Sequence, residues 1–284
     1  NSTAYGIQNR YSEYQLIYHN NINNYSASGA SYYSVGGGQH DIRNNIFSNT
    51  GGGYAIYIGS PYAIAISDYN NLYATGTLGA WSESSFSKLS EWQAGTEADQ
   101  HSVSANPSFV SESDLHVNKG LLNNAGTPIA SITTDIDGEP RNTTTPDIGA
   151  DEFEPTGVDA ALIYLEPAEI KFGSGINPVR IIVQNMGGVA LSSIEVNWTV
   201  NESPQTNYGW TGSLAPGQAD TLTIGTFDFS FGTAYEIEVI LESVNGSSDI
   251  DPTDNTLHAS DIYAAMGGTY TIGGTDPDFA TFTE

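Results

Sequence analysis

A short polar and aliphatic phrase returns three times near the start of this chain, and it constrains the fold more than any other feature. The copies begin 24 and 26 residues apart, and they read His19-Asn20-Asn21-Ile22, Arg43-Asn44-Asn45-Ile46 and Tyr69-Asn70-Asn71-Leu72. A period of this length is typical of architectures that stack one small structural unit on the next. Aligned on the paired asparagines, the copies predict a stacked column of amides and an interior aliphatic row, formed by Asn20, Asn44 and Asn70 and by Ile22, Ile46 and Leu72.

The apolar positions near these copies alternate along the chain, whereas a helix would repeat them every three or four residues. The clearest examples are Ala55-Ile56-Tyr57-Ile58 and Ala63-Ile64-Ala65-Ile66. Stacked strands of this kind predict a right-handed parallel β-helix, in which equivalent asparagines of successive coils bond one another about 4.8 Å apart. The alternative is that each Asn pair only marks a separate surface turn.

The composition indicates a folded, strongly anionic protein. Its 284 residues are enough for two domains, and only 7 Lys and Arg residues stand against 33 Asp and Glu residues, a net charge of −26. Such a surface repels nucleic acid, anionic membranes and acidic polysaccharides, and it attracts divalent cations. The sequence has no Cys, which excludes disulfides and thiolate chemistry. No run of about 18 apolar residues occurs, so no membrane span is expected.

The pattern changes along the chain and predicts an all-β fold in four regions. The coils of the β-helix and their closing segment occupy residues 1–154, in which residues 86–93 predict one short helix laid on the solenoid. Pro and Gly mark a linker at residues 155–158. Short alternating runs predict an immunoglobulin-like β-sandwich of about seven strands at residues 159–263. Residues 264–284 predict the start of a further β module, so the chain is expected to be a segment of a longer array.

Two phrases near the end of the first region carry a family resemblance. They are Asp135-Ile136-Asp137-Gly138-Glu139-Pro140-Arg141 and Pro146-Asp147-Ile148-Gly149-Ala150-Asp151-Glu152-Phe153. With them, residues 10–154 resemble the C-terminal part of the right-handed parallel β-helix modules of very large secreted and surface proteins of Bacteroidetes-type bacteria. The resemblance implies that this segment closes the open end of the β-helix, which would otherwise expose an unpaired strand edge.

The second region resembles CARDB, the cell-adhesion-related domain family of bacteria. The matching phrases are Pro178-Val179-Arg180-Ile181-Ile182-Val183-Gln184-Asn185-Met186-Gly187, Leu214-Ala215-Pro216-Gly217-Gln218 and Asp251-Pro252-Thr253-Asp254-Asn255-Thr256. The resemblance implies an extracellular spacer or adhesion module without catalytic residues. Alternation further predicts that Trp198 faces the sandwich core, because it shares its parity with Ile194, Val196 and Val200.

Parallel β-helices often host polysaccharide lyases and hydrolases, so an enzyme is the alternative function for this fold. A lyase needs a basic group beside the substrate carboxylate. The best candidates are His19, Arg43 and Tyr69, which share one predicted column, and the ordinary explanation is a surface column of mixed polar residues. The acids of the closing phrases favour turn and cap chemistry over paired catalytic carboxylates.

A divalent cation is the more credible ligand. Residues 249–255 offer four oxygen-bearing side chains for Ca²⁺, which are Asp249, Asp251, Asp254 and Asn255. The alternative is a turn between the last two strands of the sandwich, in which these side chains bond their own backbone.

Together these features favour a non-enzymatic structural or adhesive segment of a very large secreted or cell-surface modular protein. The expected partners are neighbouring modules of the same chain, surface glycans or other cells, without nucleic acid. The competing hypothesis is a secreted carbohydrate-active enzyme, a lyase or hydrolase, with an appended β-sandwich. A groove lined by charged and aromatic side chains on one β-helix face would favour the enzyme.

Overall fold

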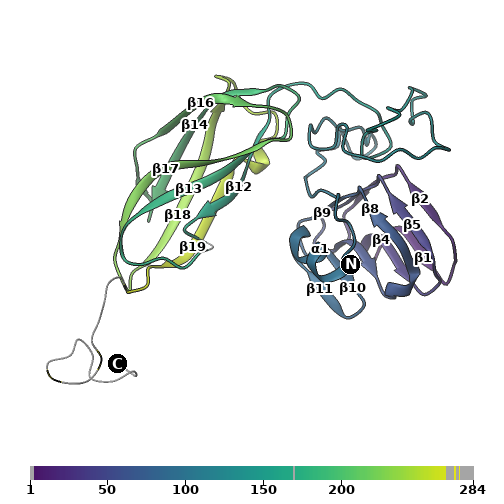
Figure 1. Ribbon diagram of the computed structural model, residues 1–284, viewed down its shortest axis with the longest axis horizontal. Helices are drawn as coiled ribbons and strands as arrows, with labels where there is room; N and C mark the ends of the chain where they lie inside the picture. The colour runs from purple at the N-terminus through teal and green to yellow at the C-terminus, as the bar shows by residue number, and fades with distance from the viewer. Residues whose placement is uncertain (1–2, 169, 267–271, 273–274, 276–284) are drawn as a thin grey trace. The chain divides into compact units, whose positions relative to one another are not determined.

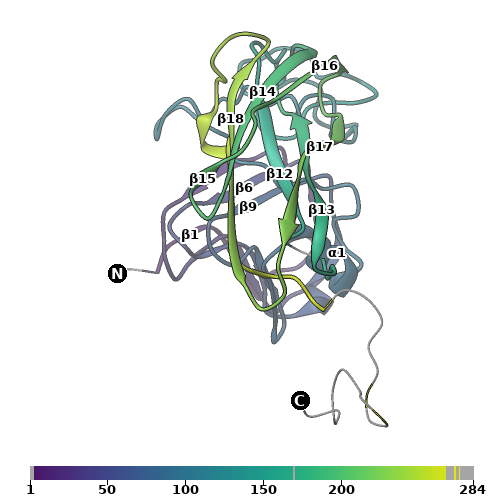
Figure 2. The ribbon, with the colours of Figure 1, turned by 90° about the vertical axis from the view of Figure 1, so that its left-hand side faces the viewer.

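The computed structural model describes residues 3–168, 170–266, 272 and 275. The chain divides into two compact units, residues 1–157 and residues 158–284. The first is a solenoid of stacked strands and the second is a sandwich of two sheets (Figures 1 and 2), which confirms the predicted fold class. No helix in the described part of the chain is long and apolar enough to cross a membrane. The predicted β module at residues 264–284 lies almost entirely outside the described residues.

Three parallel sheets build the solenoid, and each of three successive coils contributes one strand to each sheet. The first sheet contains β1 (Tyr5–Arg10), β4 (Ala30–Val35), β7 (Tyr54–Ile58) and β10 (Gly79–Trp81), with β11 (Ser84–Phe86) antiparallel at its end. The second contains β2 (Leu16–Tyr18), β5 (His40–Arg43) and β8 (Ile64–Asp68), and the third contains β3 (Asn21–Asn24), β6 (Ile46–Asn49) and β9 (Asn71–Ala74). Pairing between coils satisfies the backbone, so alternate side chains can fill the interior.

The interior row of the third sheet differs from the prediction by one residue in the middle coil. Phe47 aligns with Ile22 in the coil before it and with Leu72 in the coil after it. Phe47 and Leu72 are fully buried, and the Phe47 ring stacks on Tyr32 with centroids 5.4 Å apart. The predicted row containing Ile46 was therefore wrong.

The asparagine ladder shows the same shift. The Asn20 side-chain nitrogen donates to Asn45 Oδ1 at 2.8 Å, and the Asn45 side-chain nitrogen donates to Asn70 Oδ1 at 3.0 Å. The ladder thus runs through Asn20, Asn45 and Asn70 at a constant interval of 25 residues, and the predicted place of Asn44 in it was wrong. Asn44 occupies the turn position before the ladder with a φ of 58°, a left-handed conformation that Asn tolerates better than most residues.

Ile46 points away from the solenoid interior into a second, smaller core. It packs there against side chains of residues 104–157, the irregular segment that follows the coils. These side chains are Val117, Leu122 and Ile148. Asn21 and Asn71 align with Ile46 in the neighbouring coils. Their amides donate to carbonyls of the same irregular segment at 2.7 and 3.0 Å. One row of the third sheet therefore holds this segment in place.

The last coil is covered by α1 (Leu89–Thr96), which confirms the predicted short helix on the solenoid. Its Trp92 is fully buried, packs edge-on against Trp81, and donates from Nε1 to Asp99 Oδ2 at 2.9 Å. Asp99 Oδ1 accepts from the side-chain nitrogen of Asn70 at 3.0 Å. The amide ladder therefore ends on a buried carboxylate, and burial raises the pKa of Asp99 although side-chain donors bond it.

Residues 104–157, drawn in teal in Figure 1, run as loops alongside the solenoid. The second of the two phrases quoted above, residues 146–153 and here called the closing phrase, contacts the first two coils. Ala150 N donates to Asn21 Oδ1 and Gly149 N donates to the Asn44 carbonyl, each at 2.9 Å. Gly149 has a φ of 113°, and a Cβ there would lie 2.6 Å from Asn21 Oδ1, so only glycine fits. The expectation that this phrase closes the open end was wrong, since α1 and Asp99 cover the last coil.

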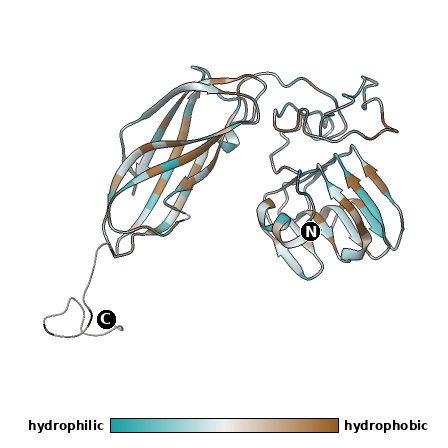
Figure 3. Ribbon diagram, viewed as in Figure 1, coloured by the Kyte–Doolittle hydropathy of each residue, from teal (hydrophilic) through white to brown (hydrophobic). Residues whose placement is uncertain are grey.

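The second unit is an antiparallel sandwich with alternating apolar and polar bands along its strands (Figure 3). One sheet contains β12 (Ala160–Glu166), β13 (Gly175–Asn185) and β17 (Ala219–Phe229). The other contains β14 (Leu191–Val200), β15 (Ser203–Pro204), β16 (Tyr208–Leu214), β18 (Ala234–Val244) and β19 (Thr256–Tyr263). Trp198 is 4% exposed within the core and donates from Nε1 to the Thr206 carbonyl at 3.0 Å, which confirms its predicted place.

We expect Asn45→Ala to lower the free energy of unfolding of the first unit by about 3 kcal/mol. Asn45 is fully buried, and its side chain bonds both neighbouring ladder amides and two backbone carbonyls. Truncation removes all of these side-chain bonds at one buried position. Denaturant unfolding of the full chain, followed by far-ultraviolet circular dichroism, measures the loss.

The matched control is Asn23→Ala, in the strand that follows Asn20. The Asn23 amide donates to the Tyr25 hydroxyl at the surface, 2.7 Å away. This substitution should cost about 0.5 kcal/mol or less. Equal losses in the two variants would contradict the role assigned to the ladder.

Candidate functional site

The three residues proposed as a catalytic column do not share one row. His19, Asn44 and Tyr69 are the left-handed residues at equivalent turns, with φ values of 52°, 58° and 56°. Arg43 lies one position earlier, aligned with Tyr18 in the first coil and Asp68 in the third. The predicted column of His19, Arg43 and Tyr69 was wrong, because the middle coil is shifted by one residue from the predicted register. The same shift places Asn45 in the ladder in place of Asn44.

His19 is buried, and both of its ring nitrogens are bonded. Nδ1 lies 2.9 Å from the Gly149 carbonyl oxygen, and Nε2 lies 2.9 Å from the side-chain nitrogen of Asn44. These partners assign the proton to Nδ1 and make Nε2 an acceptor, so the ring is neutral. Burial, reinforced by the charge of Arg141, lowers the pKa of His19 to about 4. The ring therefore attaches the closing phrase to the first coil, with both nitrogens engaged.

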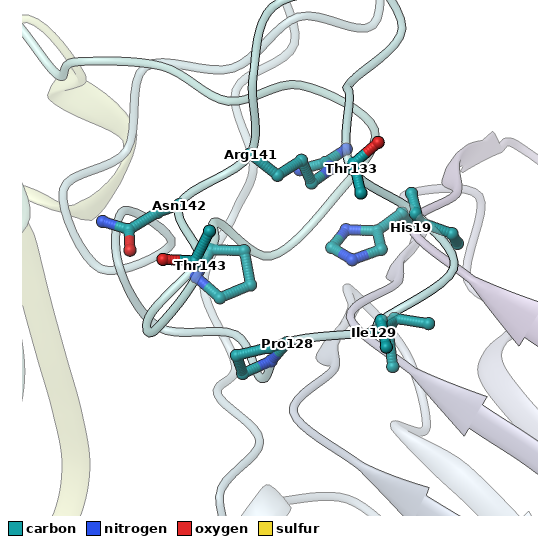
Figure 4. A pocket seen from close by; sticks show the side chains of 10 residues that line it. His19, Pro128, Ile129, Thr133, Arg141, Asn142 and Thr143 are labelled. Carbon is teal, nitrogen blue, oxygen red and sulfur yellow. The ribbon is translucent and has the colours of Figure 1, made fainter.

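The His19 ring also borders a cavity of about 300 Å³ (Figure 4). Much of the lining is apolar and comes from Pro128, Ile129, Ala130, Ile132 and Pro146. The charged side chain beside it is Arg141, whose Nη atoms donate to Glu152 and to carbonyls of the closing phrase at 2.5 to 3.2 Å. Arg141 thus binds the protein's own main chain, and the arrangement anchors a loop.

Arg43 and Tyr69 are engaged with partners of their own. The Arg43 guanidinium bonds Asp41 from Nε at 2.7 Å and from Nη2 at 2.6 Å, and these bonds raise the pKa of Arg43. The same group lies over the Tyr18 ring at 5.3 Å. Tyr69 stacks on His101 with ring centroids 4.8 Å apart. The structure therefore does not bring His19, Arg43 and Tyr69 together around one substrate position.

The acidic loop between the last strands of the sandwich shows turn chemistry. Asp249 accepts from Ala160 N at 2.8 Å and from Asp251 N at 2.9 Å. Asp251 Oδ1 accepts from the Thr253 hydroxyl at 2.6 Å. Burial, with the neighbouring Asp159 carboxylate, raises the pKa of Asp249 to about 6.

The other two predicted calcium ligands lie in the same loop. Asp254 ends a 3-10 helix, Pro252–Asp254, and the Asn255 carbonyl accepts from Leu241 N at 2.9 Å. These contacts fit the turn alternative, and they leave the calcium site of Asp249, Asp251, Asp254 and Asn255 as a prediction.

Sequence reasoning missed a cluster in the irregular segment. His116 lies between two acids, with Nδ1 against Asp114 and Nε2 2.9 Å from Asp137 Oδ2. Those bonds raise the pKa of His116 to about 9. Asp151 is the third acid beside the ring. The Asp-Leu-His spacing was a local signal for the first contact, but Asp137 and Asp151 come from separate later turns that no spacing rule connects.

Comparisons with known proteins give fold-level similarities only. No known family model matches the chain, and no curated protein matches it. A domain of a cell surface protein from Methanosarcina acetivorans, solved in solution, is 17% identical, covers 39% of this chain and 94% of that chain, and has a TM-score of 0.34. The CARDB domain of a Pyrococcus furiosus protein, crystallised in complex with di-metal ions, is 16% identical, covers 40% and 95%, and has a TM-score of 0.32.

His19 and His116 are expected to titrate on opposite sides of the ordinary histidine pKa of 6.5, His19 near 4 and His116 near 9. The stability that His19 contributes is present above pH 6.5 and lost as pH falls toward 4, whereas that of His116 is present below pH 6.5 and lost as pH rises through 9. Nuclear magnetic resonance of the ring protons of the full chain in chelator, assigned with His19→Gln and His116→Gln, measures both. A His19 signal that titrates near 6.5 would contradict its burial.

Proposed function

We propose that this chain is a non-enzymatic structural or adhesive segment of a very large secreted or cell-surface modular protein. Two units with separate hydrophobic cores support this proposal, because modules that close their own cores can be joined in series. The partners on this proposal are neighbouring modules of the same chain and surface glycans or other cells.

The observation that carries the proposal is the use made of the candidate catalytic groups. Both ring nitrogens of His19 are hydrogen-bonded within the protein, to Gly149 and Asn44, and Arg43 is paired with Asp41. A general base needs a nitrogen or oxygen within hydrogen-bond reach of the substrate proton. These side chains instead support the fold, which favours a structural role over a lyase or hydrolase.

Exposed aromatic rings support the adhesive part of the proposal. Tyr11 and Tyr14, in bends of the solenoid, are 80% and 70% exposed, and Tyr62, in the 3-10 helix Pro61–Ala63, is 88% exposed. Rings of this kind present an apolar face with a polar tip, a combination that suits sugars. The charge of −26 disfavours acidic glycans and favours neutral ones, unless a divalent cation bridges the two.

The proposal is tested on cells of the source organism. An antibody against this chain should label intact cells, or their released surface material, and external protease should remove the signal. Labelling that requires permeabilised cells would contradict the surface assignment.

The enzyme alternative is tested in parallel with the purified full chain. Incubation with pectin, alginate and other uronate polymers, with and without calcium, should yield no new unsaturated ends by ultraviolet absorbance. Sustained release that disappears in Arg43→Ala and survives in Arg10→Ala would instead establish a lyase.

Calcium at the acidic loop belongs to the same proposal. If it binds, calcium at one hundred times its dissociation constant should stabilise the second unit by about 2.7 kcal/mol, and chelation should remove that gain. Asp254→Asn should abolish the calcium effect, while Asp228→Asn, an exposed acid on β17, should leave it unchanged. Identical melting curves with calcium and with chelator would leave only the turn function of this loop.

A further inference from the structure

Three loops of the irregular segment bring one imidazole and two carboxylates together. Among the described residues, His116, Asp137 and Asp151 form the one set of three His or acidic side chains whose ligand atoms all lie within 4.8 Å of one another. His116 Nε2 is 2.9 Å from Asp137 Oδ2. One metal ion bonded to both atoms at about 2.0–2.2 Å would hold them at a similar separation.

Asp114 orients the ring for this purpose. Its carboxylate bonds Nδ1 of His116, which leaves Nε2 directed at Asp137. A histidine that binds a metal almost always donates its other ring N–H to a carboxylate, a carbonyl or water. Asp114 therefore stands outside the ligand set as a positioning residue, two positions before the histidine on the same loop.

The acids of the closing segment divide into two groups by what they bond. Asp135 and Asp147 are occupied by backbone donors, since Asp135 accepts from the nitrogens of Asp137, Glu139 and Glu152, and Asp147 from those of Asn124 and Phe153. Those two shape turns. The Asp137 carboxylate instead bonds His116 Nε2, and the Asp151 carboxylate lies beside the same ring while it bonds the Asp135 side chain.

Charge favours a divalent ion at this point. The Asp114, Asp137 and Asp151 carboxylates surround one ring, and Asp135 lies beside Asp151. A protonated imidazole cancels only one of these negative charges, whereas a divalent ion on the neutral ring cancels two. Arg141 lies near Asp135 but is bonded to the closing phrase.

The cluster is also accessible. Asp137 and Asp151 line a cavity of about 490 Å³, and His116 and Asp151 line another of about 620 Å³. The Asp137 side chain is 58% exposed, so it can adjust toward an ion at little cost. Open space on both sides leaves room for water to complete the coordination.

We propose that His116 Nε2, Asp137 and Asp151 bind one divalent metal ion of the zinc class, with Asp114 orienting the imidazole. Imidazole with carboxylates suits zinc and its neighbours, whereas Ca²⁺ takes six to eight oxygens. The ion joins three loops of a segment that has almost no regular structure of its own, and it therefore acts as a clamp on the side of the solenoid. This site is separate from the acidic loop of the sandwich and does not depend on the proposed surface role.

The test uses the full chain, stripped with chelator and then freed of it, titrated with zinc chloride by calorimetry. We expect one zinc site that His116→Ala weakens at least tenfold and that Asp114→Asn weakens less. Zinc should raise the melting temperature of the first unit, and calcium at the same concentration should not. Cobalt in place of zinc should show the visible absorption of a nitrogen-bonded ion, lost in His116→Ala.

His258→Ala is the matched control, because His258 is also paired with a carboxylate, Glu236, at 2.6 Å. Among the residues that the structure describes, it belongs to no set of three such ligands. It should retain the zinc affinity of the parent chain. Asp137→Asn provides the second variant, since its exposed side chain can lose a charge without unfolding the metal-free protein. Equal zinc affinity in His116→Ala and His258→Ala, an unchanged affinity in Asp137→Asn, or equal competition by calcium would each overturn the proposal.

Discussion

The hydrogen-bonded ladder of side-chain amides at one corner of the solenoid is the interaction on which the rest of the first unit depends. Each ladder asparagine follows a residue in the left-handed conformation, so every coil turns the same corner in the same way. The amide bonds the next coil, a carbonyl of its own turn and a carbonyl of the preceding coil, as Asn45 does with Arg43 and Ile17. Buried polar groups of this kind stabilise only when every member is satisfied. The ladder therefore fixes the register between coils as well as adding stability.

The ladder also needs an end, and the chain supplies one in Asp99. An ionised carboxylate only accepts hydrogen bonds, so Asp99 suits the last position, where no further asparagine accepts from the Asn70 amide. Trp92 bonds the other oxygen while its ring covers the final coil. Asp99 therefore joins the end of the amide ladder to the indole that covers the final coil. Burial removes water from the Asp99 carboxylate, and this desolvation raises its pKa.

The irregular segment is held by the outward-facing row of the third sheet, which consists of Asn21, Ile46 and Asn71, and not by strands of its own. Ile46 gives it a small core, while Asn21 and Asn71 bond its backbone. The same loops carry the His116 cluster, so the contacts that hold the irregular segment on the solenoid also position the proposed metal ligands. A solenoid face that combines apolar and amide side chains can thus position loops much as a scaffold positions binding residues.

The sequence by itself determined the strands, the two kinds of β architecture and the core parity of Trp198, because alternation is a local property with a period of two. It could not determine the register of the middle coil. Asn suits both the left-handed turn position, occupied by Asn44, and the ladder position, occupied by Asn45, so a pair of asparagines is ambiguous by one residue. Nor could it assemble His116 with Asp137 and Asp151, since their loops meet only after the outward row of the third sheet has placed the irregular segment. Tertiary packing decided both, because contacts between distant segments select among positions that local chemistry leaves equivalent.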